Sequence, residues 1–502
     1  MTPETDNPPG ASRPMNTNNA APTNYRWWIC SLLFFATTIN YLDRQVLSLT
    51  WKDFIVPEFH WTDNDYGTIT GLFSIFYAIS MLCAGRFVDW MDTKRGFMWA
   101  IGVWSIGACL HAFCGIATSG ILTGNWLVGF EHARQLIGAI TAVDVAARIA
   151  SVSVSLFIFA RFVLALGEAG NFPAAIKATA EYFPKRDRAY STSIFNAGAT
   201  VGALAAPVVI PPIAKAWGWE AAFIIIGALG FLWMGFWQFM YRKPEKHPRV
   251  NAAELEYIQQ DHAADAAVQA ASGNTSHATK MSFAACLKYK QTWAFAAGKF
   301  MTDGVWWFYL FWTPAYLSSV YGIKSSDSAG KLGIFVLYAI TMLSIIGGWL
   351  PSYFVGKKGM EPYAGRMKAM LIFAFFPLLA LFAQPLGKYT FWLPIIIIGI
   401  AGAAHQAWSA NLFSTIGDMF PKKAIATITG IGGMAGGVGS FIINKGAGKL
   451  FDYAGETQMT FLGFHGRESG YFIVFSVCAV AYLIGWTIMK TLVPRHRPIT
   501  DL

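Results

Sequence analysis

Two charged residues and a tyrosine lie together in the first long apolar segment of the sequence, where ionisable groups are unusual. The run is Asn40-Tyr41-Leu42-Asp43-Arg44. On a helix, Asp43 and Arg44 point about 100° apart, whereas Tyr41 and Arg44 share one face. An ionisable group buried at membrane depth is costly, so it usually faces a cavity and has a task. We therefore expect Arg44 to meet a ligand and Asp43 to meet a neighbouring helix. The alternative is a structural Asp–Arg network with another helix.

A second charged pair lies in the fourth long apolar segment, where Arg161 precedes Glu168 by seven residues. Seven residues are two helical turns, so both side chains lie on one stripe. A carboxylate in a dehydrated cavity takes up a proton readily unless it is paired with a cation. Glu168 is therefore the leading candidate for proton coupling, and a static ion pair to a neighbouring helix is the alternative.

The seventh apolar segment contains Lys299 and Asp303, which are four residues apart and can neutralise each other on one helix face. If they do not, Asp303 is a further candidate for proton coupling. The aromatic run that follows includes Trp306 and Tyr309. One face of this run is expected to stack on a sugar ring, and packing in the core or against lipid is the alternative.

Polar side chains also gather in the tenth apolar segment. They are His405, Gln406, Trp408, Ser409 and Asn411. Ligands rich in hydroxyl groups need imidazole, amide and indole partners of this kind. We expect these residues to contact a substrate, with hydrogen bonds between helices as the alternative.

The elements that hold these residues follow from composition. The 502 residues are 55% hydrophobic and only 13% charged, about half the charge of a soluble domain. A helix that crosses a bilayer needs about 20 apolar residues. Stretches that satisfy or approach this are residues 27–47, 66–88, 96–116, 151–175, 188–213, 219–241, 292–318, 328–350, 366–385, 390–413, 423–446 and 469–491. The sequence therefore predicts an all-α membrane protein with twelve transmembrane helices.

Basic residues cluster between these segments, which explains the net charge of +10 without a nucleic-acid partner. Such clusters mark cytoplasmic loops, so both termini are expected in the cytoplasm of a bacterial inner-membrane protein. The six cysteines lie in apolar segments or near the start of one. Their spacing indicates neither a metal site nor a disulfide framework, so they are interpreted as small buried residues.

An internal repeat divides the chain into two halves of six segments. Phe183-Pro184-Lys185-Arg186 recurs as Phe420-Pro421-Lys422-Lys423, and Gly202 and Gly439 follow in register. Parallel repeats of this kind place a substrate site between the halves, near the middle of the membrane. The predicted organisation is a disordered tail at 1–24, halves at 25–241 and 292–491, a cytoplasmic linker at 242–291 and a tail at 492–502. Residues 117–150 are interpreted as an outward-facing insert with an amphipathic surface helix.

The loop after the second segment contains Gly85 and Asp89, followed by Lys94 and Arg95. This spacing resembles the cytoplasmic loop signature of the major facilitator superfamily, and the chain departs from it at Asp92, where a glycine is usual. The resemblance implies that the loop is a gate, in which Asp89 pairs with the basic ends of helices in the outward-facing state.

Within that superfamily, the segments around Arg44 and Glu168 resemble the anion:cation symporter family, over nearly all of the chain except the tails and the insert. That family couples the uptake of organic anions to protons or sodium, without a cofactor. The resemblance implies that Tyr41 and Arg44 bind substrate, that Asp43 and Glu168 are coupled to protons, and that Arg161 regulates them. It also implies that Tyr77 and Asn196 line the cavity.

A narrower resemblance rests on residues 302–312 and 405–411, which are similar to bacterial hexuronate transporters. It implies a protein, expected to be monomeric, that imports glucuronate and galacturonate. Another sugar acid, such as a hexonate or hexarate, presents the same groups and is the main alternative.

Other classes of function fit the sequence less well. A drug/proton antiporter is expected to have a Gly-Pro dipeptide in the fifth segment, which this chain lacks. A membrane enzyme is disfavoured, because the sequence has no nucleophile elbow, His-Glu-x-x-His or phosphate-binding glycine motif. A passive channel is the remaining alternative, and uptake against a gradient excludes it.

The first testable prediction concerns Arg44. A planar guanidinium binds a carboxylate through two parallel hydrogen bonds, which a lysine cannot reproduce. Arg44→Lys is therefore expected to abolish uptake of labelled galacturonate into proteoliposomes. Uptake by Arg44→Lys with nearly wild-type affinity would show that Arg44 does not hold the substrate carboxylate.

Overall fold

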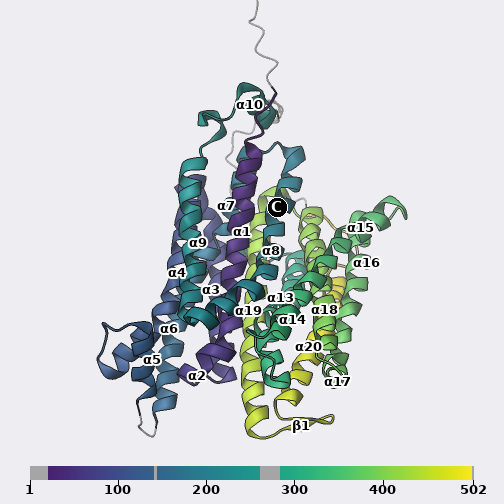
Figure 1. The fold of residues 1–502 in the computed structure, drawn as a ribbon. Coiled ribbons are helices and arrows are strands. Elements are labelled where there is room, and N and C mark those ends of the chain that lie inside the picture. Colours follow the sequence, from purple (N-terminus) through teal and green to yellow (C-terminus); the bar gives the residue numbers. More distant parts are fainter. Residues whose placement is uncertain (1–20, 141–143, 261–282, 500–502) are drawn as a thin grey trace, which may run out of the picture.

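A computed structural model describes residues 21–140, 144–260 and 283–499, and long α-helices dominate it (Figure 1). The first half consists of α1 (Arg26–Thr50), α3 (Asp63–Met91), α4 (Thr93–Thr123), α6 (Val145–Glu168) with α7 (Asn171–Tyr182), α8 (Lys185–Trp217) and α9 (Trp219–Met240). In the second half are α13 (Lys290–Tyr321), α14 (Ser328–Thr341) with η3 (Met342–Ile345) and α15 (Ile346–Gly356), α16 (Pro362–Phe375) with η4 (Phe376–Phe382) and α17 (Ala383–Gly387), α18 (Trp392–Met419), α19 (Lys422–Glu456) and α20 (Arg467–Leu492). The twelve predicted spans therefore correspond to twelve helical units.

Short elements lie at the two ends of the helices. One end carries η2 (Pro244–Lys246), α10 (Ala252–Gln259) and α12 (Phe283–Cys286), and we call it the α10 end. The opposite end, the α5 end, carries η1 (Trp51–Ile55), α2 (Val56–Phe59), α5 (Phe130–Gly138) and the hairpin of β1 (Thr460–Phe461) and β2 (Phe464–His465) (Figure 1).

Nine helical units in the described ranges are long and apolar enough to cross a membrane by length and composition. The other three are α1, α13 and α19. Charged pairs lower the hydropathy of α1 and α13, and α19 is rich in glycine. Two of the three helices with a charged pair at membrane depth therefore fall below the limit, whereas α6, which contains Arg161 and Glu168, stays above it.

Glycines allow equivalent helices to pack closely in the two halves. A Cβ at Gly202 of α8 would lie 2.4 Å from the carbonyl oxygen of Thr38 in α1. A Cβ at Gly439 of α19 would lie 2.1 Å from the carbonyl oxygen of Phe300 in α13. Both distances exclude a side chain, so each fifth helix touches the first helix of its own half through small residues. The glycines that stand in register in the sequence thus make the same contact in both halves.

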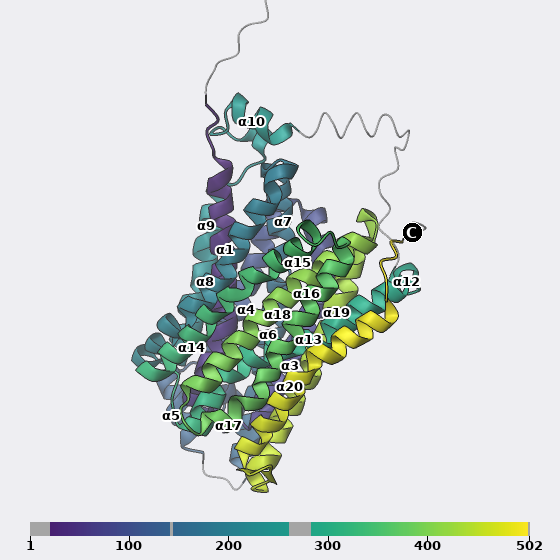
Figure 2. The same ribbon diagram turned by 90° about the vertical axis from the view of Figure 1, so that its right-hand side faces the viewer.

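The two halves meet tightly at the α5 end. Asp452 of α19 accepts hydrogen bonds from the backbone N–H groups of Asp63 and Asn64, at 2.9 and 2.7 Å, at the start of α3. Arg467 of α20 pairs with the carboxylate of Asp63 at 2.9 Å. Towards the α10 end the helices of the two halves diverge (Figure 2). The contacts of Asp452 and Arg467 thus hold the two halves together at the α5 end.

The insert is shorter in the structure than the sequence predicts. Helix α4 continues to Thr123 and α6 already begins at Val145, so both ends of the predicted range 117–150 belong to long helices. Between them, α5 buries two apolar side chains, and its Arg134 pairs with Glu58 and Glu220 at 3.2 and 2.9 Å. The sequence misplaced the boundaries because polar residues, Thr118 and Ser119 near the end of α4 and Arg148 near the start of α6, interrupt the apolar runs. Residues 141–143 lie outside the described ranges.

The predicted linker and tails are described only in part. Residues 1–20 and residues 261–282 of the predicted linker lie outside the described ranges. The predicted C-terminal tail begins at residue 492, and its described part is packed on the protein as far as Ile499. The N–H group of Ile499 donates to the carbonyl oxygen of Met419 at 2.8 Å, and His496 contacts the carbonyl oxygen of Asp418 at 3.0 Å.

Helix α10 holds the start of α1 through a buried carboxylate. Glu254 accepts hydrogen bonds from the N–H groups of Tyr25 and Arg26, at 2.9 and 3.0 Å, and from the guanidinium of Arg26 at 3.2 Å. Thr23 also donates to Glu254. Negative charge is favourable at a helix N-terminus, so Glu254 both caps α1 and pairs with its first cation.

This contact predicts a stability difference between two neighbouring glutamates. Glu254→Gln removes the charge but not the shape, and is expected to destabilise the protein by about 1–3 kcal/mol, because hydrogen bonds to a buried charged group are lost. The exposed Glu256 provides the matched control, and Glu256→Gln should leave thermal unfolding unchanged. Equal unfolding midpoints for both variants in detergent would contradict the capping role.

Candidate functional site

A buried ion pair joins α1 to α6 in the interior of the first half. Arg44 is 5% exposed, and its Nε lies 2.8 Å from Oε2 of Glu168. Glu168 is 1% exposed and is the last residue of α6. The two leading candidates from the sequence are thus partners of each other. This is the ion pair to a neighbouring helix that the sequence left open, and its cation is the expected ligand-binding arginine.

Three aromatic rings surround the Arg44 guanidinium. The ring centres of Tyr77, Trp307 and Tyr41 lie 4.6, 5.1 and 5.3 Å from the guanidinium carbon. At a desolvated site, each cation–π contact can contribute about 2 kcal/mol. Tyr41 shares a face with Arg44 as its spacing requires. Trp307 comes from α13 of the second half, so the surroundings of Arg44 span both halves.

A second cation and a second carboxylate lie near this pair. Asp43 and Arg161 are 1% and 2% exposed, and each is within electrostatic reach of the other and of Glu168. The Arg161 guanidinium carbon lies 5.1 Å from the ring centre of Phe73. Both carboxylate oxygens of Asp43, as well as Nε and Nη1 of Arg161, have no hydrogen-bond partner in the described part of the chain. The cluster thus combines two cations with two carboxylates and has unused hydrogen-bonding capacity.

The polar residues of the tenth segment form a separate cluster within the second half. The rings of Trp306 and His405 are stacked, with centres 5.4 Å apart and planes inclined by 2°. Nδ1 of His405 lies 2.9 Å from the hydroxyl of Tyr482, and Trp408 meets the same tyrosine edge-on at 5.7 Å. These contacts join α13, α18 and α20. They are the hydrogen bonds and packing between helices that the sequence left open, and substrate contact by these residues stays a prediction.

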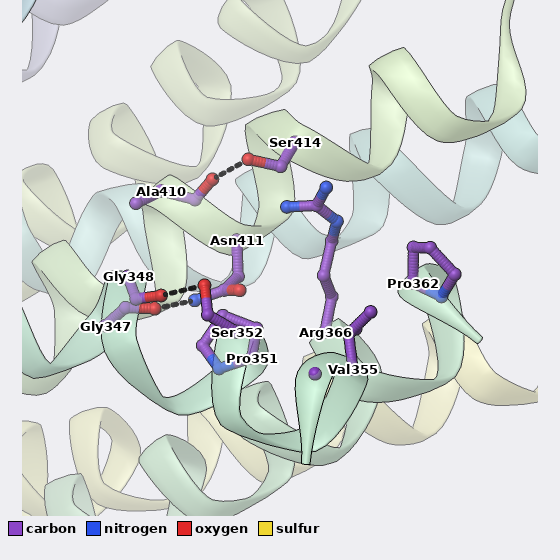
Figure 3. Close-up of a pocket in the computed structure, with 11 residues that line it drawn as sticks. Gly347, Gly348, Pro351, Ser352, Val355, Pro362, Arg366, Ala410, Asn411 and Ser414 are labelled. Atoms are coloured by element: carbon purple, nitrogen blue, oxygen red, sulfur yellow. Dashed lines mark hydrogen bonds between the residues drawn. The ribbon is translucent and has the colours of Figure 1, made fainter. Parts of the chain in front are cut away.

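Asn411 lines a different cavity of about 450 Å³ between α15, α16 and α18 (Figure 3). Its amide nitrogen donates to the carbonyl oxygens of Gly347 and Ala407, at 2.8 Å each. Arg366 reaches into this cavity and pairs with Asp418 at 2.7 Å. Asn411 therefore ties α18 to α15 and is not part of the group around Arg44.

The remaining sugar-contact candidates are spread over the protein. Tyr309 is 2% exposed and its ring lies near Phe308 and Phe475, within the second half. Gln406 and Ser409 are partly buried on α18, and Asn196 is exposed on α8. Their contact with a ligand stays a prediction.

Lys299 and Asp303 form the ion pair that their spacing favours. Nζ of Lys299 lies 2.7 Å from Oδ2 of Asp303. Asp303 fits against α19 because Gly436 has no side chain, and a Cβ there would lie 2.2 Å from Oδ2. Asp303 is thus neutralised by its own helix and lies between α13 and α19.

The residues of the gate signature do not form the loop that the sequence predicts. Gly85 and Asp89 belong to α3, whereas Lys94 and Arg95 belong to α4, and only Asp92 separates the two helices. The predicted second segment stopped at residue 88, so the last turn of α3 was assigned to a loop. Lys94 donates to the carbonyl oxygen of Gln238 at 2.7 Å, whereas Gly85 is partly buried and Arg95 is exposed. The side chain of Asp89 lies outside what the structure describes. The gate function of these residues stays a prediction.

Asp92 explains why glycine is usual at its position. Its φ is +68°, a conformation that residues with a side chain rarely adopt. Its carboxylate lies 3.2 Å from Nζ of Lys243. Burial alone would raise the pKa of Asp92, but hydrogen bonds from Lys243 and the backbone of Thr93 bring it below its usual value. A glycine would adopt this φ without strain, whereas the aspartate forms an ion pair with Lys243 that a glycine could not form.

The charged residues Asp43, Arg44, Arg161 and Glu168 with the aromatic rings around them are called the Arg44 group. Two of its aromatic residues, Trp307 beside Arg44 and Phe73 beside Arg161, are not singled out by the sequence. Trp307 was part of a recognised aromatic run, but Trp306 and Trp307 are adjacent and point about 100° apart. Only the rotation of α13 against α1 decides which of them faces Arg44. Phe73 gave no signal, since it is one of 40 phenylalanines.

The two six-helix halves and the paired charges buried within them define the class of a multi-pass membrane transporter. The model of the Major Facilitator Superfamily matches residues 33–443, and the chain belongs to that superfamily. Its members are transporters and not enzymes. The predicted superfamily and the prediction of a transporter rather than an enzyme are therefore confirmed.

Similar proteins include sugar-acid transporters. The chain is 27% identical over 473 residues to the hexuronate transporter of Escherichia coli (strain K12), covering 93% of this chain and 94% of that protein. It is 24% identical over 429 residues to a probable galactarate/D-glucarate transporter of the same strain, covering 83% and 86%. A bacterial homologue of the human lysosomal transporter Spinster, crystallised in an inward-facing and occupied conformation, has a similar fold. Its TM-score is 0.65 at 17% identity, with 95% of this chain and 99% of that chain covered.

Proposed function

We propose that this protein is a proton-coupled symporter that imports hexuronates, glucuronate and galacturonate, through the inner membrane by alternating access. The observation that carries the proposal is the buried Arg44–Glu168 pair inside an aromatic enclosure. The similarity to a hexuronate transporter over nearly the whole chain supports the substrate class. The chemistry of the pair supports proton coupling and the binding of a carboxylate.

Arg44 can serve one carboxylate fully at a time, and this competition couples proton to substrate. With Glu168 ionised, the guanidinium is engaged by the protein itself. A proton on Glu168 removes that attraction, so the guanidinium is free to bind a substrate carboxylate in two parallel hydrogen bonds. Loss of the proton returns Glu168 to Arg44 and displaces the substrate. One proton thus accompanies each carboxylate.

The aromatic rings around Arg44 suit the rest of the ligand. Tyr41 and Tyr77 offer hydroxyl groups to a polyhydroxylated ring, and Trp307 offers a flat apolar face. Because Trp307 belongs to the second half, a bound ligand would contact both halves at once. Contacts of that kind let a ligand favour one arrangement of the halves over another, as alternating access requires.

The proposed orientation places the α10 end in the cytoplasm. Basic clusters at the connections between helices support it, under the positive-inside rule. In this arrangement the contacts of Asp452 and Arg467 close the outer end, while the helices diverge toward the inner end. The structure would then correspond to the inward-facing half of the cycle.

Transport of a hexarate such as galactarate or glucarate is the second candidate, and the similarity to a galactarate/D-glucarate transporter favours it. A hexarate has two carboxylates and needs two cations. Arg161 is a second cation within electrostatic reach of Arg44, and its Nε and Nη1 have no hydrogen-bond partner in the described ranges. Competition of labelled galacturonate uptake by a panel of hexuronates, hexonates and hexarates separates the two candidates.

The aromatic enclosure gives a prediction with a matched pair of tryptophans. Trp307→Leu removes a ring from Arg44 and is expected to weaken galacturonate binding about 5- to 30-fold, the equivalent of about 1–2 kcal/mol. Trp306→Leu changes the adjacent residue, which stacks on His405 instead, and is expected to change binding less. Affinities measured on the purified variants test this. A larger loss for Trp306→Leu would move the substrate site to the His405 cluster.

The coupling mechanism makes a prediction for Glu168. Gln mimics the protonated acid in shape and charge, so Glu168→Gln is expected to bind galacturonate and exchange it across proteoliposome membranes. It should not concentrate galacturonate when a pH gradient is imposed. Asp43→Asn is the companion variant and is expected to slow exchange and accumulation alike, because Asp43 lies among the charges that must rearrange.

Three results would overturn this assignment. Full proton-driven accumulation by Glu168→Gln would shift the coupling role to Asp43 or Asp303. Accumulation driven by a sodium gradient at constant pH would replace the proton by sodium. Failure of Glu168→Gln to bind galacturonate at all would show that the carboxylate positions Arg44 rather than competing for it.

A further inference from the structure

A cationic cavity lies at the α10 end, outside the Arg44 group. It has a volume of about 450 Å³ and is formed by the start of α13, the end of α20 and the chain that follows α20. Its lining residues are Lys290, Gln291, Thr491, Leu492, Val493, Pro494, Arg495 and Arg497. Three of these eight residues are cations and none is acidic, so the cavity selects for an anion.

The cations of this cavity have no ion-pair partner in the part of the chain that the structure describes. Within the described ranges, no carboxylate forms an ion pair with Lys290, Arg495 or Arg497. All three are exposed. Among the described residues these three positive charges around one hollow are uncompensated, so they repel each other and a bound anion would relieve that repulsion.

The backbone that carries these cations is held in place. Nε2 of Gln291 donates to the carbonyl oxygen of Arg497 at 2.9 Å, and Nζ of Lys490 donates to that of Pro494 at 2.6 Å. The contacts of His496 and Ile499 with α18 fix the chain on either side of Arg497. The cavity is therefore preformed, and binding need not order a loose tail.

An exposed apolar surface leads away from the cavity along both helices. On α20, Val477, Val480 and Ile484 are 52%, 39% and 44% exposed, and their spacing continues to Thr491 at the cavity. On α13, Trp293 and Phe300 are 54% and 37% exposed. Helices α13 and α20 pack against each other, as Figure 2 shows near the C-terminus. Such side chains in a membrane protein face lipid tails.

We propose that this cavity binds the phosphodiester headgroup of an anionic phospholipid in the cytoplasmic leaflet. Lys290, Arg495 and Arg497 hold the phosphate, and the acyl chains lie on the apolar surface formed by Val477, Val480, Ile484, Trp293 and Phe300. Basic cavities between helices on the cytoplasmic side of membrane proteins suit such headgroups. The adjoining apolar surface favours a lipid over a free phosphate ion, which would use only the cations. The leaflet follows from the proposed orientation, and the site does not depend on which anion is transported.

The test is a lipid titration of the purified full-length protein followed by native mass spectrometry. Phosphatidylglycerol and phosphatidylcholine with identical acyl chains are compared. The wild type is expected to prefer phosphatidylglycerol. The triple variant Lys290→Gln/Arg495→Gln/Arg497→Gln is expected to bind it at least about 10-fold more weakly, since each cation contributes to attraction at the membrane surface. Its affinity for phosphatidylcholine should not change.

A second triple variant controls for net charge. Lys246→Gln/Lys357→Gln/Lys358→Gln removes three exposed cations elsewhere and should bind phosphatidylglycerol like the wild type. If the first triple variant does not fold, Lys290→Gln alone is expected to weaken binding about 5-fold. The proposal is overturned if the cavity variants retain wild-type affinity or if the control loses as much. It is also overturned if inorganic phosphate displaces the lipid at equal concentration, which would indicate a site for the free ion.

Discussion

A charge buried at membrane depth needs an opposite charge beside it, and the Arg44–Glu168 pair is the contact on which the interior of this protein depends. With side chains 6% and 0% exposed, neither group can be solvated by bulk water. Removing either one would leave the other unpaired in a medium of low dielectric constant, at a cost of several kcal/mol. The pair therefore fixes α1 against α6, and any event that weakens it must supply a replacement. A proton for Glu168 together with an anion for Arg44 is such a replacement.

The packing of the helices determines what surrounds this pair. In each half the first helix is held by a glycine of the fifth, Gly202 against α1 and Gly439 against α13. Close packing of this kind leaves little freedom in the rotation of α1 and α13, because small residues fit against backbone rather than against flexible side chains. The rotation of α13 then directs Trp307 to Arg44 and Trp306 to His405. A repeat that is visible in the sequence thus positions the aromatic side chains of the site.

How far the sequence predicts this protein depends on the distance over which each signal acts. Apolar runs are local, so all twelve helical units were predicted, and the shared face of Tyr41 and Arg44 follows from helix geometry alone. The partner of Glu168 did not follow, because 124 residues separate it from Arg44 and only tertiary packing brings them together. For the same reason, the sequence does not predict which of Trp306 and Trp307 faces Arg44. Asp92 is an intermediate case. The sequence shows that a usual glycine is replaced there, and only the structure shows the positive φ that explains the preference for glycine.

The net charge of the buried cluster links its structure to the proposed transport cycle. Arg44 and Arg161 carry two positive charges, and Asp43 and Glu168 carry two negative ones, so the ionised cluster is neutral. A proton alone would leave it at +1, and a substrate carboxylate alone would leave it at −1. Both states put a net charge in a dehydrated interior, which is unfavourable. Proton and anion together restore neutrality, so the loaded and the empty clusters are the two states that can cross between inward- and outward-facing arrangements without an uncompensated charge. Under this constraint, coupling arises because each partially loaded state is electrostatically penalised.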